Sequence, residues 1–287
     1  MSTKVLVLGA TGMLGNAVFR YLSDDPQLLV WGTLQNPGGK RFFADNLHPF
    51  LIASINVLDF DTLAGAFEKV RPDVVINCIG LIKQLADAND PLSALPINAL
   101  LPHRLAKLCA LSGARLIHVS TDCVFSGRKG MYTEADPSDA EDLYGKSKYI
   151  GEVHDAPYAI TLRTSIIGHE LSSRVGLIEW FLAQEDSVKG YAKAIFSGLP
   201  TVELARIMRT FVLPNPVLSG LYQVSAAPID KYSLLKLVAD IYQKTIAIVP
   251  DERVCIDRSL DSTRFRQATG YVPPSWPELI LTMKNFK

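Results

Sequence analysis

The fold is decided near the N-terminus by the stretch Val5-Leu6-Val7-Leu8-Gly9-Ala10-Thr11-Gly12-Met13-Leu14-Gly15. Its four apolar residues predict a buried strand, and its three glycines permit a tight turn into a helix over residues 14–22. Such a turn lets the backbone approach a pyrophosphate, which is attracted by the free N–H groups and the positive dipole end of the helix. The spacing is GxxGxxG and not the GxGxxG of the standard fingerprint, so the prediction depends on its position after the first strand. We therefore expect a dinucleotide cofactor at this turn.

The same strand-to-helix rhythm continues through the first half of the chain. Up to about residue 165, short apolar runs alternate with helical patterns such as residues 101–111, which is typical of βαβ units around a parallel sheet. Several of the runs are continuously apolar, as in strands that are covered on both faces. The expected strands are residues 4–8, 28–33, 51–55, 74–78, 116–120 and 160–163.

After Gly168 the rhythm changes, and the pattern predicts helices at residues 175–182, 202–213 and 232–242 with a strand at 221–224. We expect an α/β fold: a Rossmann-type doubly wound parallel sheet with a smaller C-terminal α+β substrate domain. The expected domains are an NAD(P)-binding domain, residues 1–168 with a return segment near 199–225, and a substrate domain, residues 169–198 and 226–287.

The composition excludes several classes of function. Of the 287 residues, 48% are hydrophobic and 20% are charged, as in an ordinary globular protein. Lys and Arg together number 29, as do Asp and Glu, so no net charge attracts nucleic acid or an anionic membrane. The four cysteines form no CxxC pair and the five histidines show no ligand spacing, so no metal site is expected. With no signal-peptide pattern and no apolar run of about 18 residues, we expect a cytoplasmic protein without membrane or nucleic-acid partners.

The end of the second predicted strand bears on which cofactor binds. NAD sites usually carry a carboxylate about 20 residues after the glycines, but residues 32–36 contain no acid, and Lys40 and Arg41 follow them. A neutral strand end beside cations suits the 2′-phosphate of NADPH. If both cations belong only to a solvated loop, NADH is the alternative. The other residues expected beside the cofactor follow the third and fourth strands, and they are Asn56, Val57, Cys78, Ile79 and Gly80.

A hydroxyl, a phenol and an ammonium are expected beside that cofactor. The strand at 116–120 is followed by Thr121, whose hydroxyl stands where open α/β sheets bind ligands. Tyr144 and Lys148 are four residues apart, so on a helix they share a face. The nearby ammonium is expected to lower the pKa of the phenol toward neutrality and so make it a general acid. Together with a nicotinamide, these groups predict the reduction of a carbonyl.

A second Tyr-x-x-x-Lys pair serves as an internal control. Tyr232 and Lys236 have the same spacing, but no strand ending in Ser-Thr precedes them. Their helix is amphipathic, so we assign Tyr232 to packing and Lys236 to the solvated face. The spacing alone therefore carries little weight, and its context selects Tyr144 and Lys148.

With these motifs the chain resembles the extended short-chain dehydrogenase/reductase superfamily, and within it the dTDP-4-dehydrorhamnose reductase-like sugar-nucleotide reductases. The resemblance is carried by residues 9–15, 120–127 and 144–152. It implies that Thr121, Tyr144 and Lys148 are catalytic. The implied cofactor cradle consists of Gly9, Thr11, Gly12, Met13, Leu14 and Gly15, with Tyr144 and Lys148 also contacting the cofactor. The implied substrate-binding residues are Thr121, Asp122, Cys123, Tyr144 and Arg258, with the Arg258 guanidinium as a diphosphate clamp.

The function implied by this resemblance is the reduction, by NADPH, of the 4-keto group of a nucleotide-activated 6-deoxyhexulose in deoxysugar and surface polysaccharide biosynthesis. The sugar is left open, because Cys123 replaces the family's usual aromatic residue and residues 81–84 also differ from the family pattern. A dTDP-linked sugar and an N-acetylated UDP-linked sugar are equally acceptable. The resemblance also allows a homodimer.

The same residues help to distinguish three related classes of protein. Sugar-nucleotide 4,6-dehydratases carry Thr-Asp-Glu, and Cys123 cannot replace that glutamate, so dehydration is not expected. A sugar-nucleotide epimerase would need the same tyrosine with a retained cofactor, and it stays an alternative. The regulatory subunit of methionine adenosyltransferase resembles this fold and acts as a partner-binding module. The intact Thr121, Tyr144 and Lys148 argue against that non-catalytic role.

Overall fold

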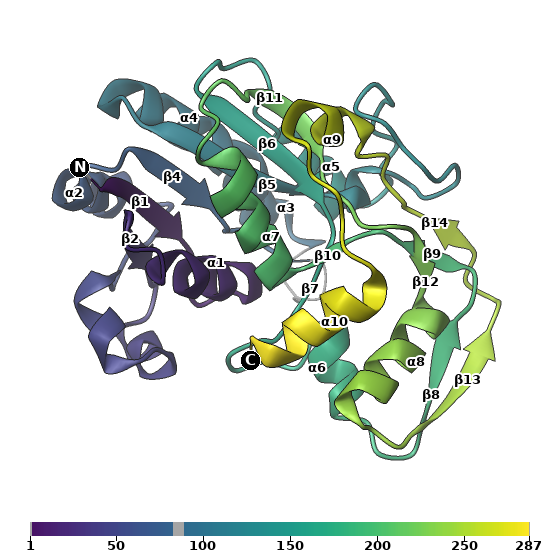
Figure 1. Ribbon diagram of the computed structural model, residues 1–287. Helices are drawn as coiled ribbons and strands as arrows, with labels where there is room; N and C mark the ends of the chain where they lie inside the picture. Colours follow the sequence, from purple (N-terminus) through teal and green to yellow (C-terminus); the bar gives the residue numbers. More distant parts are fainter. Residues whose placement is uncertain (1, 83–88, 287) are drawn as a thin grey trace.

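The computed structural model describes residues 2–82 and 89–286, and a seven-stranded parallel sheet forms its centre (Figure 1). The strand order is β3-β2-β1-β4-β5-β6-β11, and every neighbouring pair is parallel. The strands are β1 (Thr3–Leu8), β2 (Leu28–Thr33), β3 (Leu51–Ile52), β4 (Val74–Asn77), β5 (Arg115–Thr121), β6 (Ala159–Thr164) and β11 (Gly220–Gln223). The chain reverses its direction across the sheet between β1 and β4, and open α/β sheets bind ligands at the carboxyl ends of strands at such a point. The expected Rossmann-type sheet is confirmed.

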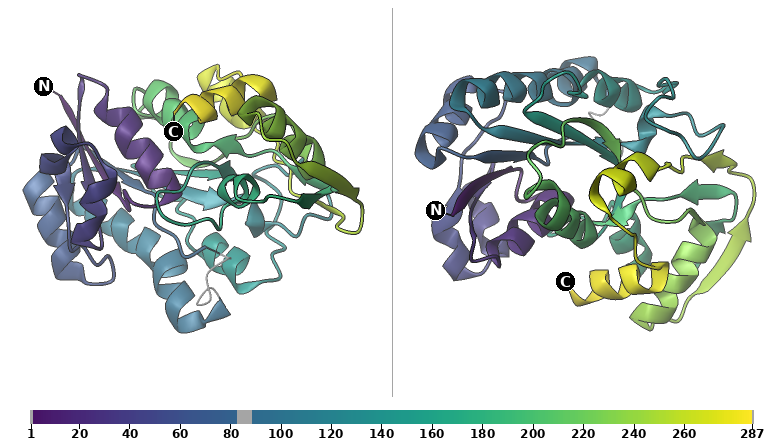
Figure 2. Two further views of the ribbon diagram at one scale, coloured as in Figure 1. Left: turned by 90° about the horizontal axis from the view of Figure 1, so that it is seen from below. Right: turned by 45° about the horizontal axis from the view of Figure 1, so that its top comes forward.

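Helices cover both faces of this sheet, which is why its strands are continuously apolar (Figures 1 and 2). The helices whose apolar faces build the two cores of the sheet include α1 (Met13–Ser23), α2 (Phe60–Val70), α4 (Leu101–Ser112) and α7 (Thr201–Ile207). Alternate residues of β1 face opposite sides: Val5 and Val7 belong to the apolar cluster of α1 and α7, and Leu6 and Leu8 to that of α2 and α4. Two cores therefore hold the strand ends in fixed positions.

The smaller elements lie mostly beyond the carboxyl ends of the large sheet (Figure 1). Three small sheets pair β9 (Ala194–Phe196) with β12 (Ile229–Asp230) and β14 (Ile256–Asp257), β8 (Ser187–Tyr191) with β13 (Ala247–Asp251), and β7 (Ile166–Ile167) with β10 (Leu199–Pro200). The other α-helices are α3 (Pro91–Ala94), α5 (Leu143–Ile150), α6 (Leu177–Leu182), α8 (Lys231–Tyr242), α9 (Thr263–Thr269) and α10 (Trp276–Asn285). Tighter or wider turns form η1 (Pro37–Phe42), η2 (Asp45–Phe50), η4 (Leu95–Leu100), η5 (Asp122–Val124) and η6 (Met208–Val212).

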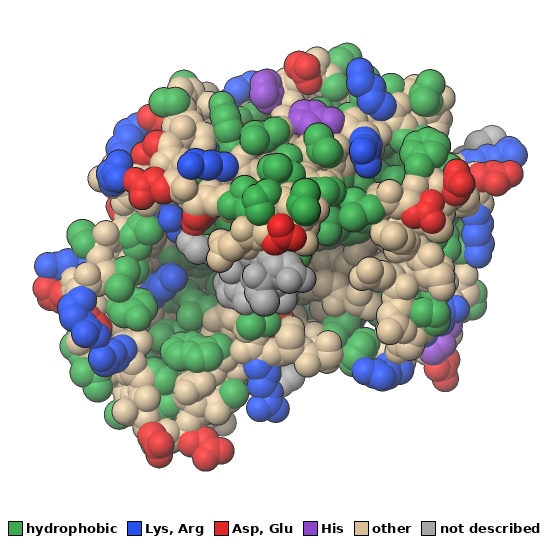
Figure 3. Space-filling model, turned by 180° about the vertical axis from the view of Figure 1, so that it is seen from behind, with side chains coloured by type: hydrophobic (Ala, Val, Ile, Leu, Met, Phe, Trp, Pro, Cys, Tyr) green, Lys and Arg blue, Asp and Glu red, His purple; other side chains and the backbone are tan. Residues whose placement is uncertain are grey.

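Seen from behind, the molecule is hollowed between these later elements and the large sheet (Figure 3). Hydrophobic side chains gather above the hollow. Within residues 2–82 and 89–286, no helix combines the length and the apolar character that a membrane crossing requires.

Two predicted elements differ from the observed ones, and the others begin and end within two residues of their expected bounds. Strand β3 ends at Ile52, because Ser54 adopts φ +63°, a left-handed conformation that interrupts an extended strand. The helix expected over residues 202–213 is α7 followed by the wider π-helical turn η6. There the buried Arg115 guanidinium donates to the carbonyl oxygens of Val212 and Leu218 at 2.6 and 2.7 Å. A side chain far away in the sequence therefore satisfies a carbonyl at the end of this helix, where the last C=O groups have no partner within the helix.

Candidate active site

The glycine turn after β1 has the shape that a dinucleotide requires. Gly9 adopts φ +82°, and a Cβ there would stand 2.7 Å from Cγ1 of Ile79. The N–H of Gly12 donates to the Gly9 carbonyl oxygen at 3.0 Å. A Cβ on Gly15 would clash with that same oxygen, so α1 can approach β1 this closely only with glycine at this position. The three glycines thus serve the turn, the cap and the helix–strand contact.

The N-terminus of α1 is free to receive an anion. Its N-cap residue is Gly12, which provides no side-chain hydrogen bond, and the first turn contains no acidic residue. The helix is 11 residues long, and its first N–H groups and its dipole point toward the turn. The residues of the predicted cradle therefore fit a pyrophosphate.

The segment after β2 packs directly on the glycine turn. The Thr33 hydroxyl accepts a hydrogen bond from the Gly9 N–H at 3.0 Å. A Cβ on Gly39, in η1, would stand 2.8 Å from Cγ2 of Thr11, which shows how closely η1 covers the turn. This contact brings Lys40 and Arg41 to the ribose end of the cradle, Lys40 half-buried and Arg41 exposed, with no acid in residues 32–41.

The other predicted cofactor residues also lie at the carboxyl ends of the strands. The exposed Asn56 side chain accepts from the Leu58 N–H at 3.1 Å, and Val57 packs on the core of α2 and α4. After β4, burial raises the pKa of the Cys78 thiol to about 12, so it stays protonated. A Cβ on Gly80 would stand 3.8 Å from Nζ of Lys148. The end of β4 therefore connects the glycine turn with Lys148.

Helix α5 brings the predicted phenol and ammonium to the end of β5. The Asp142 side chain caps this helix by accepting from the Gly145 N–H at 2.8 Å. Lys148 is buried, and its Nζ donates to the Val119 carbonyl oxygen at 2.8 Å. The phenol of Tyr144 lies close enough to the Thr121 hydroxyl for the two groups to interact. The structure therefore brings together all three residues predicted to be catalytic.

The pKa of Tyr144 is shifted in the direction opposite to the one expected. Burial raises it most, the neighbouring acidic groups of Cys123 and Asp122 would add to the rise when ionised, and the Thr121 hydroxyl opposes it. The pKa of Lys148 is itself lowered, to about 8, by burial. Because Nζ is directed to the Val119 oxygen, the ammonium does not offset the burial of the phenol. Tyr144 consequently holds its proton at neutral pH, and it is a weaker acid than a free tyrosine.

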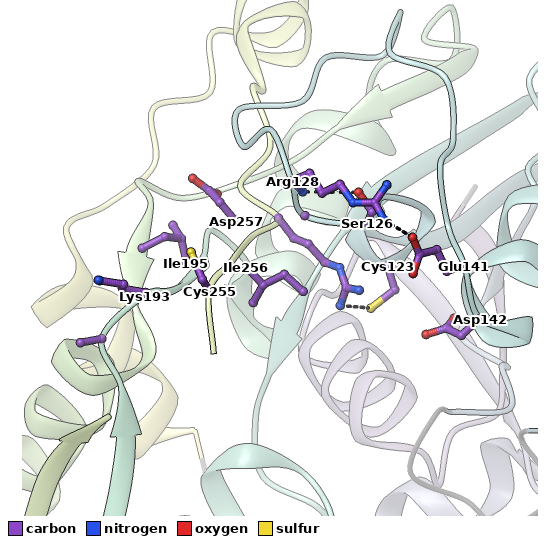
Figure 4. A pocket seen from close by; sticks show the side chains of 13 residues that line it. Cys123, Ser126, Arg128, Glu141, Asp142, Lys193, Ile195, Cys255, Ile256 and Asp257 are labelled. Carbon is purple, nitrogen blue, oxygen red and sulfur yellow. Dashed lines mark hydrogen bonds and ion pairs between the residues drawn. The ribbon is translucent and has the colours of Figure 1, made fainter. Parts of the chain in front are cut away.

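A cavity of about 850 Å³ adjoins this group (Figure 4). Cys123 and Asp142, the neighbours of the triad in sequence, line it together with residues of the β9 and β14 region. The Arg258 guanidinium donates from Nε to the Phe125 carbonyl oxygen at 2.8 Å and from Nη1 to the Cys123 sulfur at 3.6 Å. It is therefore held in the cavity wall by uncharged groups, and its charge faces a space large enough for a nucleotide.

The other two cations of the cavity wall are arranged differently. Arg128 pairs with Glu141, and Lys193 pairs with Glu252 at 2.8 Å. These carboxylates neutralise both cations. Arg258 is consequently the best-placed of the three for an anionic ligand.

The comparison with known proteins identifies the family. The family described as "RmlD substrate binding domain" matches residues 3–245. The chain belongs to this family. The predicted membership of the extended short-chain dehydrogenase/reductase superfamily is thereby confirmed, and the expected oxidoreductase class agrees with the relatives.

Curated relatives of this RmlD-family chain carry two kinds of name. The zebrafish (Danio rerio) methionine adenosyltransferase 2 subunit beta is 30% identical over 253 residues, which cover 83% of this chain and 74% of that protein. The match to the mouse (Mus musculus) protein of the same name spans only 42% of its length. The dTDP-4-dehydrorhamnose reductase of Aggregatibacter actinomycetemcomitans is 24% identical, and the match covers 99% of each chain.

Solved structures share the fold of this RmlD-family chain over its whole length. The dTDP-4-dehydrorhamnose reductase of Bacillus anthracis, in complex with NADP, superposes with a TM-score of 0.80 at 21% identity and covers 100% of this chain and 99% of that one. The Bordetella bronchiseptica enzyme WbmG, in complex with NAD and UDP, gives a TM-score of 0.78 at 18% identity, with coverage of 100% and 95%.

One residue of the site was not predicted from the sequence. Asn98 is buried in the π-helical turn η4. Its Oδ1 accepts from the Leu81 N–H at 2.9 Å, and its Nδ2 donates to the Leu81 carbonyl at 3.0 Å and to the Ser147 hydroxyl at 3.3 Å. Asn98 thus ties the chain after β4 to α5, between Tyr144 and Lys148. The available signal was a lone amide in the apolar stretch 92–101. Of the segment 81–84, Lys83 and Gln84 lie outside the described residues.

Proposed function

We propose that the protein reduces the 4-keto group of a nucleotide-activated 6-deoxyhexulose, with NADPH as the reductant, in deoxysugar and surface polysaccharide biosynthesis. The nucleotide is dTDP or UDP, and an N-acetylated sugar is included. The observation that carries the proposal is the placement of Thr121, Tyr144 and Lys148 on β5 and α5, beside a glycine turn shaped for a dinucleotide. The names of several relatives support the same reaction class.

The cofactor is proposed to lie along the carboxyl ends of β1, β2 and β4. Its pyrophosphate would meet the N-terminus of α1, and its 2′-phosphate would meet Lys40 and Arg41, because no carboxylate near the end of β2 would repel it. NADH is the alternative, since relatives of known structure hold NADP or NAD. The further residues proposed to contact it are Gly9, Thr11, Gly12, Met13, Leu14, Gly15, Asn56, Val57, Cys78, Ile79, Gly80, Tyr144 and Lys148.

When bound, NADPH supplies the hydride to the carbonyl carbon. Tyr144 is protonated at neutral pH and would donate its proton to the carbonyl oxygen. The Thr121 hydroxyl orients the same oxygen from the end of β5. Lys148 donates one N–H to the Val119 oxygen, which fixes the side chain and leaves its other two N–H groups for the cofactor ribose. The three residues thus have separate roles in proton donation, orientation and cofactor binding.

The substrate is proposed to occupy the cavity of about 850 Å³. Arg258 would bind the diphosphate, and Asp122 and Cys123 would line the sugar site next to Thr121. Burial raises the pKa of Asp122, while the charge of Arg258 opposes the rise. In this arrangement residues 1–168, with the return segment 199–225, carry the cofactor, and residues 169–198 and 226–287 carry the substrate.

The test is NADPH absorbance with a panel of 4-keto-6-deoxy sugars linked to dTDP, UDP and GDP. Oxidation with one of them supports the proposal and names the sugar. Conversion of a sugar to its epimer without net NADPH oxidation would instead identify an epimerase.

A second candidate, a non-catalytic regulatory subunit, is favoured by one observation. The zebrafish relative named methionine adenosyltransferase 2 subunit beta is 30% identical over 83% of this chain. A partner-binding role does not require Thr121, Tyr144 and Lys148 to lie together, and their placement on β5 and α5 favours the reductase. Absence of NADPH oxidation with every sugar, together with tight binding to a methionine adenosyltransferase catalytic subunit, would establish the regulatory role.

A further inference from the structure

Outside the proposed active site, three polar side chains meet in the later part of the chain. His169 Nδ1 lies 2.5 Å from Oε1 of Glu179, and His169 Nε2 lies 2.8 Å from the hydroxyl oxygen of Tyr242. Because a carboxylate only accepts, Nδ1 donates to Glu179, and in the neutral imidazole the Tyr242 hydroxyl donates to Nε2. Burial and then the Glu179 charge raise the pKa of Tyr242, which keeps its hydroxyl a donor. Both nitrogens of the imidazole are therefore hydrogen-bonded.

Three helices hold the partners of His169. Glu179 belongs to α6, and Tyr242 is the last residue of α8. From α10, Lys284 places its Nζ 5.8 Å from the centre of the Tyr242 ring and donates to the Ile241 carbonyl oxygen at 2.8 Å. The His169 and Glu179 side chains are only 12% and 17% exposed, so water has little access to their hydrogen bond. These contacts consequently fix the position of the His169 side chain.

Residues 168–176, which include His169, are held by contacts within the segment and with α7. At its start, a Cβ on Gly168 would clash with the hydroxyl of Thr201, the first residue of α7. Glu170 then accepts from the Ser173 hydroxyl at 2.6 Å and from the Gly176 N–H at 2.7 Å. The direction in which residues 170–176 project is therefore set by how His169 is held.

This segment ends against the glycine turn. A Cβ on Gly176 would stand 3.5 Å from Sδ of Met13, the first residue of α1. We propose that residues 168–176 form one wall of the cofactor site, and that His169 is the positioning residue that holds this wall against the turn. The inference rests on the proposed function only in that the turn binds NADPH.

Removing the His169 side chain should weaken cofactor binding without slowing the chemical step. Without the His169 side chain, residues 168–176 are free to leave the position in which they contact the cofactor. If they occupy that position about one tenth of the time, the apparent Kd for NADPH rises about tenfold. The KM for NADPH should rise equally, while kcat is retained, because Thr121, Tyr144 and Lys148 belong to β5 and α5. His169→Asn should restore much of the affinity, since its amide N–H can donate to Glu179 as Nδ1 does.

The experiment is a fluorescence titration of the full chain with NADPH and NADH, with thermal melts as the test of folding. His169→Ala, His169→Asn and Tyr242→Phe are compared with the wild type. The matched control is Arg253→Ala, which breaks the 2.6 Å ion pair with Asp251 on β13, away from the turn (Figure 1). The expected order of Kd is wild type and control lowest, then His169→Asn and Tyr242→Phe, then His169→Ala.

An unchanged Kd in folded His169→Ala would overturn the inference and leave the proposed function standing. A fall in kcat with an unchanged KM would also overturn it. If His169→Ala does not fold, Tyr242→Phe decides, because it keeps the ring and removes only the bond to Nε2; an unchanged Kd then refutes the positioning role. A wild-type protein that binds neither nucleotide would overturn both this inference and the proposed function.

Discussion

Tyr144→Phe removes a single oxygen atom from the proposed active site. The lost group is the phenolic hydroxyl near Thr121, and the ring stays in place. Thr121 still donates to Oδ1 of Asp122 at 3.2 Å and accepts from the Cys123 N–H at 3.1 Å, so no buried group loses all its partners. One hydrogen bond contributes about 1 kcal/mol to the free energy of unfolding. A loss of that size lowers the Tm of a chain of this length by about 2–4 °C, so the variant should remain folded.

The effect on the rate should be much larger than the effect on stability. General acid catalysis contributes about 10²–10⁴-fold, which corresponds to about 3–5 kcal/mol of activation free energy. Because the glycine turn, η1 and Lys148, through which the cofactor is proposed to bind, are unchanged in this variant, the Kd for NADPH should stay near the wild-type value. The measurements are kcat from NADPH oxidation and Kd from fluorescence titration.

Tyr232→Phe is the matched control. Tyr232 lies on α8 and packs on β8, since a Cβ on Gly190 would stand 2.8 Å from its Cα. The Nζ of Lys236 lies 5.6 Å from the centre of its ring. Turnover of Tyr232→Phe should therefore be nearly unchanged. Loss of activity in folded Tyr232→Phe, with activity retained in Tyr144→Phe, would refute the mechanism.

Three further outcomes are expected. Gly15→Ala should lose NADPH binding in a fluorescence titration, because the added Cβ would clash with the Gly9 carbonyl oxygen; wild-type affinity would show that the turn is not the cradle. The ratio of kcat/KM for NADPH to that for NADH should exceed one and should fall in the double variant Lys40→Ala and Arg41→Ala, because both cations near the 2′-phosphate are removed; a wild-type preference for NADH would contradict this. Lys148 is charged below its lowered pKa of about 8, so kcat/KM should fall as the pH rises through 8. In Lys148→Met, kcat/KM should be low at every pH, NADPH binding should be weaker, and kcat/KM should not fall as the pH rises through 8. A fall at the same pH in that variant would show that another group causes it.

The glycine turn and the sheet could be predicted because their determinants are local. A short apolar run followed by regularly spaced glycines permits few backbone conformations, and Gly9 adopts the left-handed φ that such a turn needs. Residues that follow parallel strands meet at one edge of the sheet, which is why Thr121 could be placed beside the cofactor. The early end of β3 could not be predicted in this way, because a serine gives no warning that Ser54 will adopt φ +63°.

The electrostatics and the supporting contacts of the site depend on distances in space. The pKa of Tyr144 rises because of how deeply the ring is buried and because the Lys148 ammonium is directed to the Val119 oxygen. Neither the burial of Tyr144 nor the direction of the Lys148 ammonium can be predicted from the spacing of four residues between them. The bond between His169 and Tyr242 joins residues 73 positions apart, and no sequence pattern links them.

The central claim, hydride transfer to a carbonyl with Tyr144 as the proton donor, is tested most directly by isotope transfer. The protein would be incubated with NADPH carrying deuterium at the transferable position and with the 4-keto-6-deoxy sugar nucleotide that supports oxidation, and the product would be examined by mass spectrometry and NMR. The account predicts deuterium at C4 of the sugar, in proportion to the NADPH consumed, and almost none with Tyr144→Phe over the same time. A product without deuterium, or an epimer formed while NADPH is conserved, would contradict it.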